Sequence, residues 1–205
     1  MSNLINERSM VWLYEELERP LISVLSRMED AGVGVDVTEL TRMRDYLVGE
    51  VQRLESSIHD LAGHDFNVNS TKQLREVLFE ELGLTPQKKT KTGYSTDAAS
   101  LEKIRDQHEI VAVLLEYREV EKLRSTYGQG LLDVTDSDGR IRATFNQTVA
   151  RTGRLSSEDP NLHNIPVRTS LGREFRKAFV PTEGFELLVA DYNQIELRVI
   201  AHLAE

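Results

Sequence analysis

The sequence contains no cysteine among its 205 residues, so neither a disulfide bond nor a thiolate metal site can form. Long hydrophobic runs are also lacking. The longer ones, such as "VAVLL" at 111–115, fall far short of the roughly 20 residues that span a bilayer. The first residues are polar and acidic, unlike a secretory signal peptide. We therefore expect a cytoplasmic protein with no membrane segment.

Positive charge is also in short supply. The chain has 25 basic and 34 acidic residues, a net charge of -9, which at first argues against a nucleic-acid partner. The distribution weakens that argument, because residues 1–66 hold 6 basic and 13 acidic side chains, whereas residues 139–177 hold 8 and 3. The acidic excess lies at the front of the chain, so charge alone does not exclude nucleic acid.

Helical periodicity dominates the first two thirds of the sequence. One apolar stripe predicts a long helix that begins at an N-cap, Thr38, and ends at Gly63. The stripe consists of Leu40, Met43, Leu47, Val51, Leu54, Ile58 and Leu61. It fits either an intramolecular helix pair, which we favour, or a dimerisation seam. A helix is also predicted over 13–28, with Pro20 at a start or a kink.

Further helices and turns follow the same logic. Ser70 and Gln73 have the spacing of a capping box that opens a helix through about Leu82. The stretch 85–96 is nearly free of apolar residues and reads as an exposed loop. Helices are predicted from about Ser100 and over 109–127, with "AGVGVD" at 31–36 forming a turn and a short strand.

The period changes to two near the end of the chain. Alternating residues at 141–145 predict a half-buried strand, and "FELLVADY" at 185–192 predicts a second one. Helices followed by a sheet indicate an α+β fold.

Asp191 is the sharpest local feature. It ends the apolar run 187–190, which suits a central strand buried on both faces, where an ionised carboxylate is costly unless paired or bound to metal. The alternative is an N-cap for a helix that begins near Gln194. The local pattern leaves both open.

Several motifs together resemble family A DNA polymerases, the bacterial DNA polymerase I type. "TGRLSSEDPNLHNIP" (152–166) and "DYNQIELR" (191–198) flank "RKAFV" (176–180) at a family-like spacing. Upstream, "FNVNSTKQLREVLFEELGL" (66–84), "KTKTGYST" (89–96) and "YREVEKLRSTY" (117–127) resemble the thumb of that family. The resemblance runs from about Tyr14 to Glu205.

The resemblance implies three regions. Residues 1–30 would form a lead-in helix and 31–135 a helical thumb with a mobile tip near 84–96. Residues 136–205 would form part of a palm, with an incomplete antiparallel sheet that ends in the first metal-binding motif.

For the palm, the resemblance assigns Asp191 as a catalytic aspartate that holds Mg²⁺, with the Tyr192 backbone carbonyl as a further ligand. Two cations would activate the primer 3′ hydroxyl and neutralise the leaving pyrophosphate. Glu196 matches the glutamate that leaves no room for a 2′ hydroxyl, with Gln194 and Ile195 lining the same nucleotide pocket.

For DNA, the resemblance implies minor-groove contacts from Arg154, Asn161, His163 and Asn164, because correct base pairs share their minor-groove acceptors. It also implies phosphate contacts from the thumb. These residues are Asn67, Asn69, Ser70, Ser95, Thr96, Arg118, Lys122 and Ser125. The alternatives are a loop that only folds on itself and a mixed-charge, solvated helix face.

Two positions depart from the usual motifs: Asn193 replaces a serine and His163 a glutamine. Both keep hydrogen-bonding capacity, so they affect fine nucleotide selection rather than the reaction type.

The family's fingers helix and second metal-binding aspartate are expected beyond the last residue, and its nuclease domains before the first. We therefore expect a monomeric piece of a replication and repair polymerase that binds primer-template duplex DNA and, in the complete enzyme, deoxynucleoside triphosphates. Alone it should not polymerise. The alternatives are a non-catalytic DNA-binding or adaptor module, and a dimerisation module built on the stripe at 40–61.

Overall fold

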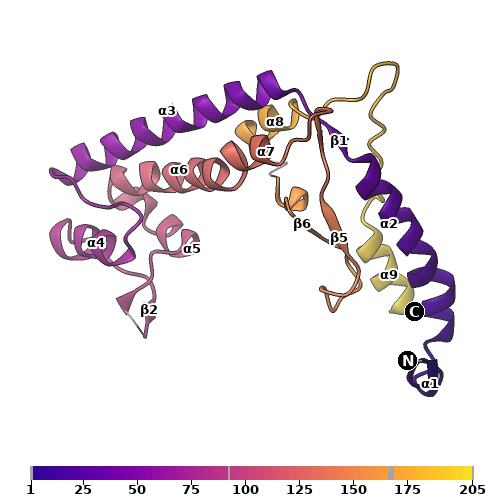
Figure 1. The fold of residues 1–205 in the computed structure, drawn as a ribbon. Coiled ribbons are helices and arrows are strands. Elements are labelled where there is room, and N and C mark those ends of the chain that lie inside the picture. The colour runs from indigo at the N-terminus through magenta and orange to yellow at the C-terminus, as the bar shows by residue number, and fades with distance from the viewer. Residues whose placement is uncertain (1, 92, 166–168, 205) are drawn as a thin grey trace.

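The computed structural model describes residues 2–91, 93–165 and 169–204, most of which lie in helices (Figure 1). The helices of the first part are α1 (Ser2–Glu7), the π-helical η1 (Leu13–Glu18), α2 (Arg19–Ala31), α3 (Val37–Ala62), α4 (Thr71–Arg75) and the π-helical η2 (Glu76–Glu81). Those of the second part are α5 (Ala98–Glu102), the 3-10 helix η3 (Arg105–Gln107), α6 (Glu109–Leu123), the π-helical η4 (Arg124–Gly128), α7 (Gln129–Asp133), the 3-10 helix η5 (Leu162–Asn164), α8 (Ser170–Arg176) and α9 (Ile195–Leu203).

The strands of the described ranges are short and form antiparallel pairs. These pairs are β1 (Val33–Gly34) with β4 (Arg140–Ile141), β2 (Lys89–Thr90) with β3 (Gly93–Tyr94), and β5 (Thr144–Asn146) with β6 (Ser156–Glu158). The predicted α+β class is confirmed. The strand expected over 141–145 is divided, because β4 and β5 pair with different partners.

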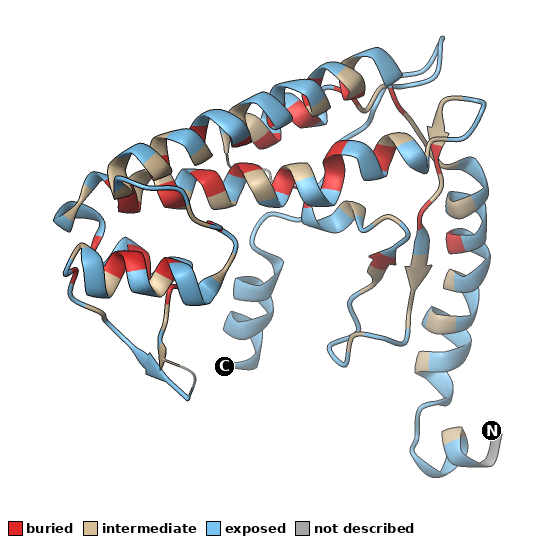
Figure 2. Ribbon diagram, turned by 60° about the vertical axis from the view of Figure 1, so that its left-hand side comes forward, coloured by how far each residue is buried: buried red, intermediate tan, exposed pale blue. Residues whose placement is uncertain are grey.

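The core lies between α3 and α6, which run side by side and bury the sides that face each other (Figure 2). The buried residues of α3 are Leu40, Met43, Leu47, Val51, Leu54 and Ile58. Those of α6 are Ile110, Val111, Leu114, Tyr117, Val120 and Leu123. The predicted stripe is therefore used within the chain, as an intramolecular pair, and is not available as a dimerisation seam.

The start of α3 differs from the prediction by two residues. Asp36, not Thr38, is the N-cap: its Oδ1 accepts hydrogen bonds from the Thr38 and Glu39 amides at 2.9 and 3.0 Å. Gly63 ends the helix as predicted, with a left-handed φ of 81° that a residue without Cβ adopts freely.

The α3/α6 pair forms the bar of an arch (Figure 1). From one end hang α4, α5 and the β2/β3 hairpin, and from the other hang β5, β6 and α2. The stretch 85–96, expected to be a plain loop, contains that hairpin, in which Lys89 pairs with Tyr94. It is mostly exposed, as predicted.

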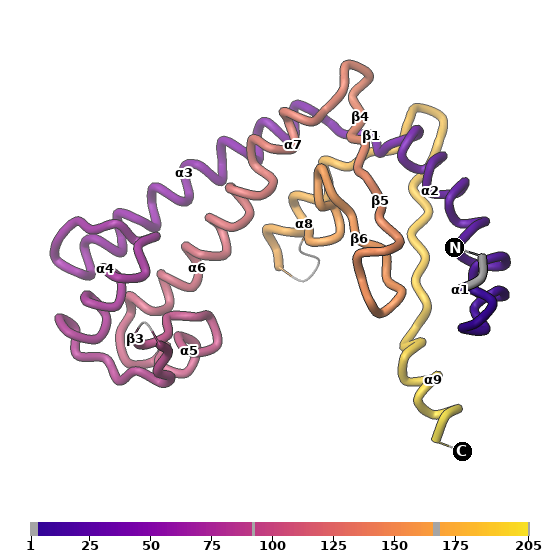
Figure 3. The backbone as a smooth tube through the Cα atoms, turned by 60° about the horizontal axis from the view of Figure 1, so that its bottom comes forward, coloured from indigo at the N-terminus to yellow at the C-terminus, as the bar shows by residue number. Residues whose placement is uncertain are grey.

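The strand predicted over 185–192 is wrong: this segment is extended but unpaired. Its apolar side chains are exposed, with Leu188 at 93% and Val189 at 90%. A strand needs a neighbour to satisfy its backbone groups, and no other segment of the described ranges pairs with this one. The helix that follows, α9, is exposed throughout and stands away from α2 in Figure 3.

None of the helices in the described part of the chain combines the length and the apolar character needed to cross a bilayer.

We predict that Leu47→Ala lowers the free energy of unfolding by about 2–5 kcal/mol, because Leu47 is fully buried between α3 and α6 and its removal leaves a cavity. Val48→Ala, on the 38% exposed neighbour, is the control and should change stability by less than about 0.5 kcal/mol. Urea unfolding followed by circular dichroism measures both. Equal losses in the two variants would contradict the assigned core.

Candidate nucleic-acid interface and the Asp191 segment

The loop that enters α5 is tied to α6 by an arginine. Arg118 donates hydrogen bonds to the Thr96 carbonyl and, at 3.2 Å, to Thr96 Oγ1. Burial lowers the pKa of the Arg118 guanidinium, which nevertheless stays charged near neutral pH. Thr96 is itself only 7% exposed. The structure thus brings these two predicted DNA-binding residues together, with the Thr96 hydroxyl facing Arg118 rather than the surface.

Asp97 caps α5 and organises the same loop. Its carboxylate accepts hydrogen bonds from Ser95 Oγ and from the Ser100 amide, both at 2.7 Å. The bond from Ser95, followed by those from Ser100, lowers the pKa of Asp97 to about 2. The predicted phosphate ligand Ser95 is therefore bonded to a cap, Asp97, that is not among the predicted site residues. An Asp directly before a helical pattern, as in "DAASL", is the signal that could have found it.

The residues predicted around the start of α4 hold one another and α6. Ser70 is the N-cap, with its Oγ 3.4 Å from the Gln73 amide. Gln73 does not complete the expected capping box, because its Oε1 accepts from the Asn67 amide at 2.6 Å. Asn69 Nδ2 donates to the buried Tyr117 hydroxyl at 2.9 Å. This region is thereby anchored on the long helix pair.

Lys122, near the end of α6, and Ser125, in η4, are both exposed, as the predicted helical face requires. Ser125 Oγ donates to the Lys122 carbonyl at 3.2 Å, while the Lys122 side chain reaches solvent. Of the three residues predicted for this face, Arg118 points toward Thr96, whereas Lys122 and Ser125 remain at the surface.

The loop 154–164, which contains the short elements β6 and η5, folds around the buried hydroxyl of Ser157, which is 1% exposed. That hydroxyl donates to the Pro160 carbonyl at 3.1 Å and accepts from the Leu162 amide at 3.4 Å. The Tyr127 hydroxyl of η4 donates to the Asn161 carbonyl at 3.3 Å, which holds the loop against the helix pair. No sequence pattern singles out Ser157, because a serine in a turn-rich loop is ordinary.

With the loop backbone held in this way, its predicted contact residues point outward. Arg154, Asn161, His163 and Asn164 are all exposed. The His163 ring lies 5.9 Å from that of Phe145 in β5. The loop thus folds on itself through its backbone and still presents donors to the surface, so the two alternatives for it are compatible.

Arg154 also meets the first turn of α9. Its Nη2 lies 3.2 Å from Glu196 Oε1, which joins a predicted minor-groove donor to a predicted nucleotide-pocket residue. The two side chains are 79% and 67% exposed, so the ion pair contributes little to stability. Ile195 begins α9, and Gln194 precedes it with a left-handed φ of 50°.

Asp191 and Tyr192 lie in the exposed segment before α9. Asp191 does not cap α9, whose N-cap position is Gln194 and has no side-chain hydrogen bond. A carboxylate and a backbone carbonyl are oxygen donors that suit Mg²⁺. However, no group of three or more His, Asp or Glu side chains within the described ranges is placed to hold a metal ion. Among the described residues, the Asp191 segment therefore does not form a metal site by itself.

We predict that Asp97→Asn lowers the melting temperature at pH 7, because the native carboxylate has a pKa of about 2 against 3.8 for a free one. A depressed carboxyl pKa stabilises the fold above pH 4, and the contribution is lost as the pH falls from about 4 toward 2. The difference between wild type and variant should therefore shrink between pH 4 and pH 3 in calorimetry. Asp106→Asn, at an exposed position, is the control, and a pH-independent difference would contradict the assignment.

Comparisons with known proteins match this chain to one family. The model of DNA polymerase family A matches residues 37–205. The chain is 53% identical over 195 residues to DNA polymerase I of Bacillus subtilis (strain 168), covering 94% of this chain and 22% of that protein. It is 52% identical over 204 residues to the thermostable DNA polymerase I of Thermus aquaticus, covering 98% and 24%. The chain spans about a quarter of the length of these relatives.

A solved structure matches as well. The POL domain of Pol1 from M. smegmatis, in complex with DNA primer-template and dNTP, superposes with a TM-score of 0.90 at 41% identity. The match covers 98% of this chain and 36% of the other.

Proposed function

The chain belongs to DNA polymerase family A, and on that premise we propose that it forms the thumb and the first part of the palm of a DNA-directed DNA polymerase. The observation that carries the proposal is the match, along 98% of the chain, to a polymerase domain bound to primer-template and dNTP. Residues 1–30 lead into the domain, 31–135 form the thumb with its tip near 84–96, and 136–205 begin the palm.

The thumb holds the primer-template backbone. Lys122 at the end of α6 and Ser125 in η4 face solvent, and the Lys122 ammonium attracts phosphates of any sequence. Ser70, Ser95 and Asn69 stand at the starts of α4 and α5. Arg118 contributes chiefly by holding the loop that carries Ser95, because its guanidinium is already bonded to Thr96.

The loop 154–164 reads the minor groove beside the primer end. Purine N3 and pyrimidine O2 accept hydrogen bonds at similar positions in all correct base pairs, so exposed donors can test pairing without reading sequence. Arg154, Asn161, His163 and Asn164 are exposed donors on a loop whose backbone is fixed by Ser157 and Tyr127. That combination of a fixed backbone and outward donors suits a pairing check.

The Asp191 segment supplies one side of the catalytic centre. Asp191 offers a carboxylate and Tyr192 a backbone carbonyl, while Gln194, Ile195 and Glu196 line the pocket of the incoming deoxynucleoside triphosphate. Bound there, Mg²⁺ would lower the pKa of the primer 3′ hydroxyl and neutralise the leaving pyrophosphate. We infer that the chain alone does not polymerise, because Asp191 could bridge two cations but could not fix both without further ligands.

The Asp191 role can be tested in a chimera in which this chain replaces the matched stretch of Bacillus subtilis DNA polymerase I. The chimera should extend a primer on its template, and Asp191→Asn should reduce the rate at least about a hundredfold, because even outer-shell partners of a metal cost 10–100-fold. Asp106→Asn is the charge-matched control and should extend normally. Primer extension resolved on a sequencing gel measures all three.

Two outcomes would contradict the proposal. A chimera that binds primed template and adds no nucleotide would favour the non-catalytic DNA-binding module. Equal extension by the Asp191→Asn variant and its parent would remove Asp191 from the catalytic centre.

A further inference from the structure

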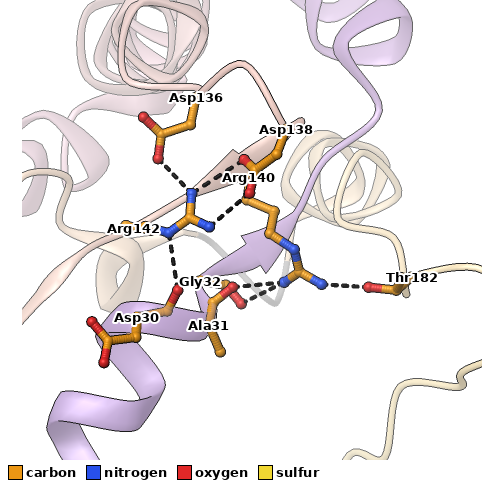
Figure 4. A network of polar contacts seen from close by, with 8 residues as sticks. All are labelled: Asp30, Ala31, Gly32, Asp136, Asp138, Arg140, Arg142 and Thr182. Carbon is orange, nitrogen blue, oxygen red and sulfur yellow. Dashed lines mark hydrogen bonds and ion pairs between the residues drawn. The ribbon is translucent and has the colours of Figure 1, made fainter.

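Two arginines, Arg140 and Arg142, hold the end of α2 from more than a hundred residues away (Figure 4). The last carbonyls of a helix have no partner within the helix and carry its negative dipole end, so they attract cations. Arg142 Nε donates to the Asp30 carbonyl at 3.0 Å. Arg140 Nη1 donates to the carbonyls of Ala31 and Gly32 at 2.8 and 3.0 Å.

The other edge of Arg142 holds the turn that precedes β4. Its Nη1 lies 2.6 Å from Asp136 Oδ2, and its Nη2 lies 2.7 Å from Asp138 Oδ2. The guanidinium lowers the pKa of the Asp138 carboxyl, so the pair is charged at neutral pH. The planar fork of an arginine reaches the helix end and both carboxylates at once, which a lysine cannot do.

Around Gly32 and Gly34, neighbouring segments approach the backbone so closely that a Cβ atom would not fit at either position. Gly32 has a φ of +60°, and a Cβ there would stand 2.8 Å from both the Arg142 Cγ and the Ile141 carbonyl oxygen. A Cβ on Gly34 would stand 2.7 Å from the Val180 carbonyl oxygen. The sequence "AGVG" thus lets α2, β4 and the segment near Val180 approach one another.

The same arginine pair reaches the segment that leads to Asp191. The Arg140 guanidinium also donates to Thr182 Oγ1. Two further hydrogen bonds join the residues before Thr182 to the residues just before α3. The Val180 amide donates to the Gly34 carbonyl at 3.0 Å, and the Asp36 amide donates to the Ala178 carbonyl at 2.8 Å. Three parts of the chain therefore meet here: the end of α2, the start of α3 and the start of the Asp191 segment.

We propose that Arg140 and Arg142, together the arginine latch, are positioning residues that fix the angle at which the thumb leaves α2 and the palm. The consequence for DNA rests on the proposed function. Between α2 and α3 the chain passes through only residues 32–36, where the arginine contacts add to the β1/β4 pairing and to the Val180–Gly34 and Asp36–Ala178 hydrogen bonds. The 26 residues of α3 span about 39 Å, and a tilt of about 10° at its base moves the far end by about 7 Å. Such a shift removes any contact between the tip and a phosphate.

The latch can be tested by a distance measurement that needs no DNA. The chain has no cysteine, so Ser26→Cys on α2 and Ser56→Cys on α3 can be spin-labelled specifically. Double electron–electron resonance should give a single narrow distance distribution in the parent. Arg140→Met combined with Arg142→Met should at least double its width. The Arg→Lys pair should broaden it almost as much, because lysine keeps the charge and loses the fork.

A second label pair, Ser56→Cys with Glu119→Cys, lies within the α3/α6 pair and should stay narrow in every variant. Arg19→Met, which removes a surface pair with Glu15, is the matched control and should leave both distributions unchanged. Unfolding of the Met variants would be revealed by a broader distribution for the second label pair. In that case Asp138→Asn and Thr182→Val are used instead, because each removes only one partner of the latch. Unchanged widths between α2 and α3 in all folded variants would overturn the latch.

The effect on DNA is measured in the chimera. With single encounters between enzyme and primed template, the latch variants should make shorter products, whereas the single-turnover rate of nucleotide addition stays unchanged. Product length per encounter does not depend on the fraction of folded enzyme, so simple destabilisation would not shorten products. Normal product length in variants with a broadened α2–α3 distance would overturn the role of the latch in holding DNA. A parent chimera without activity would instead count against the proposed function.

Discussion

The packing of α3 against α6 determines where the candidate contacts of this chain lie. The start of α4 is attached to α6 through the Asn69–Tyr117 hydrogen bond of 2.9 Å, and the tip is attached to α6 through the Arg118–Thr96 contacts. The loop 154–164 is attached to η4, the continuation of α6, through Tyr127. Buried tyrosines whose hydroxyls emerge from an apolar core thus connect the helix pair to both groups of outward-facing residues. The packed helix pair thus sets the separation of the two groups in the fold.

Periodicity predicts the helices well because their packing partners lie in the same chain. The spacing of Leu40 to Ile58 encodes a buried face, and α6 covers that face. The predicted N-cap of α3 differs from the observed one because Asp36 and Thr38, two residues apart, are both residue types that cap helices well. Only the backbone direction after β1 decides between them. The segment 185–192 shows the converse. Its apolar run has the composition of a strand, but composition supplies no pairing partner, and the described residues contain none.

The sequence predicts the candidate residues that belong to a motif. It does not predict the long-range contacts that support them. The exposed donors Arg154, Asn161 and Asn164 follow from the motif. The support beneath them, Ser157 and Tyr127, has no local signature. The arginine latch is hidden for the same reason, since Arg142 is separated from Asp30 by 112 residues and only the fold makes them neighbours.

The two halves of the proposed function place different demands on the chain. Holding DNA requires exposed cations, and among the proposed phosphate contacts of the described ranges Lys122 is exposed. Catalysis requires a carboxylate at a fixed position among other ligands, and Asp191 lies in an unpaired, exposed segment. Under the proposed function, the chain would therefore contribute more to holding DNA than to the catalytic centre.

The affinity of the 205-residue chain for primed duplex DNA, measured between 50 and 200 mM salt, tests this claim most directly. Phosphate contacts release counterions, so the logarithm of the affinity should fall linearly with the logarithm of the salt concentration. Two unrelated duplex sequences should give the same line. Affinity that does not change with salt, or that differs strongly between the two sequences, would contradict a grip built on the phosphate backbone.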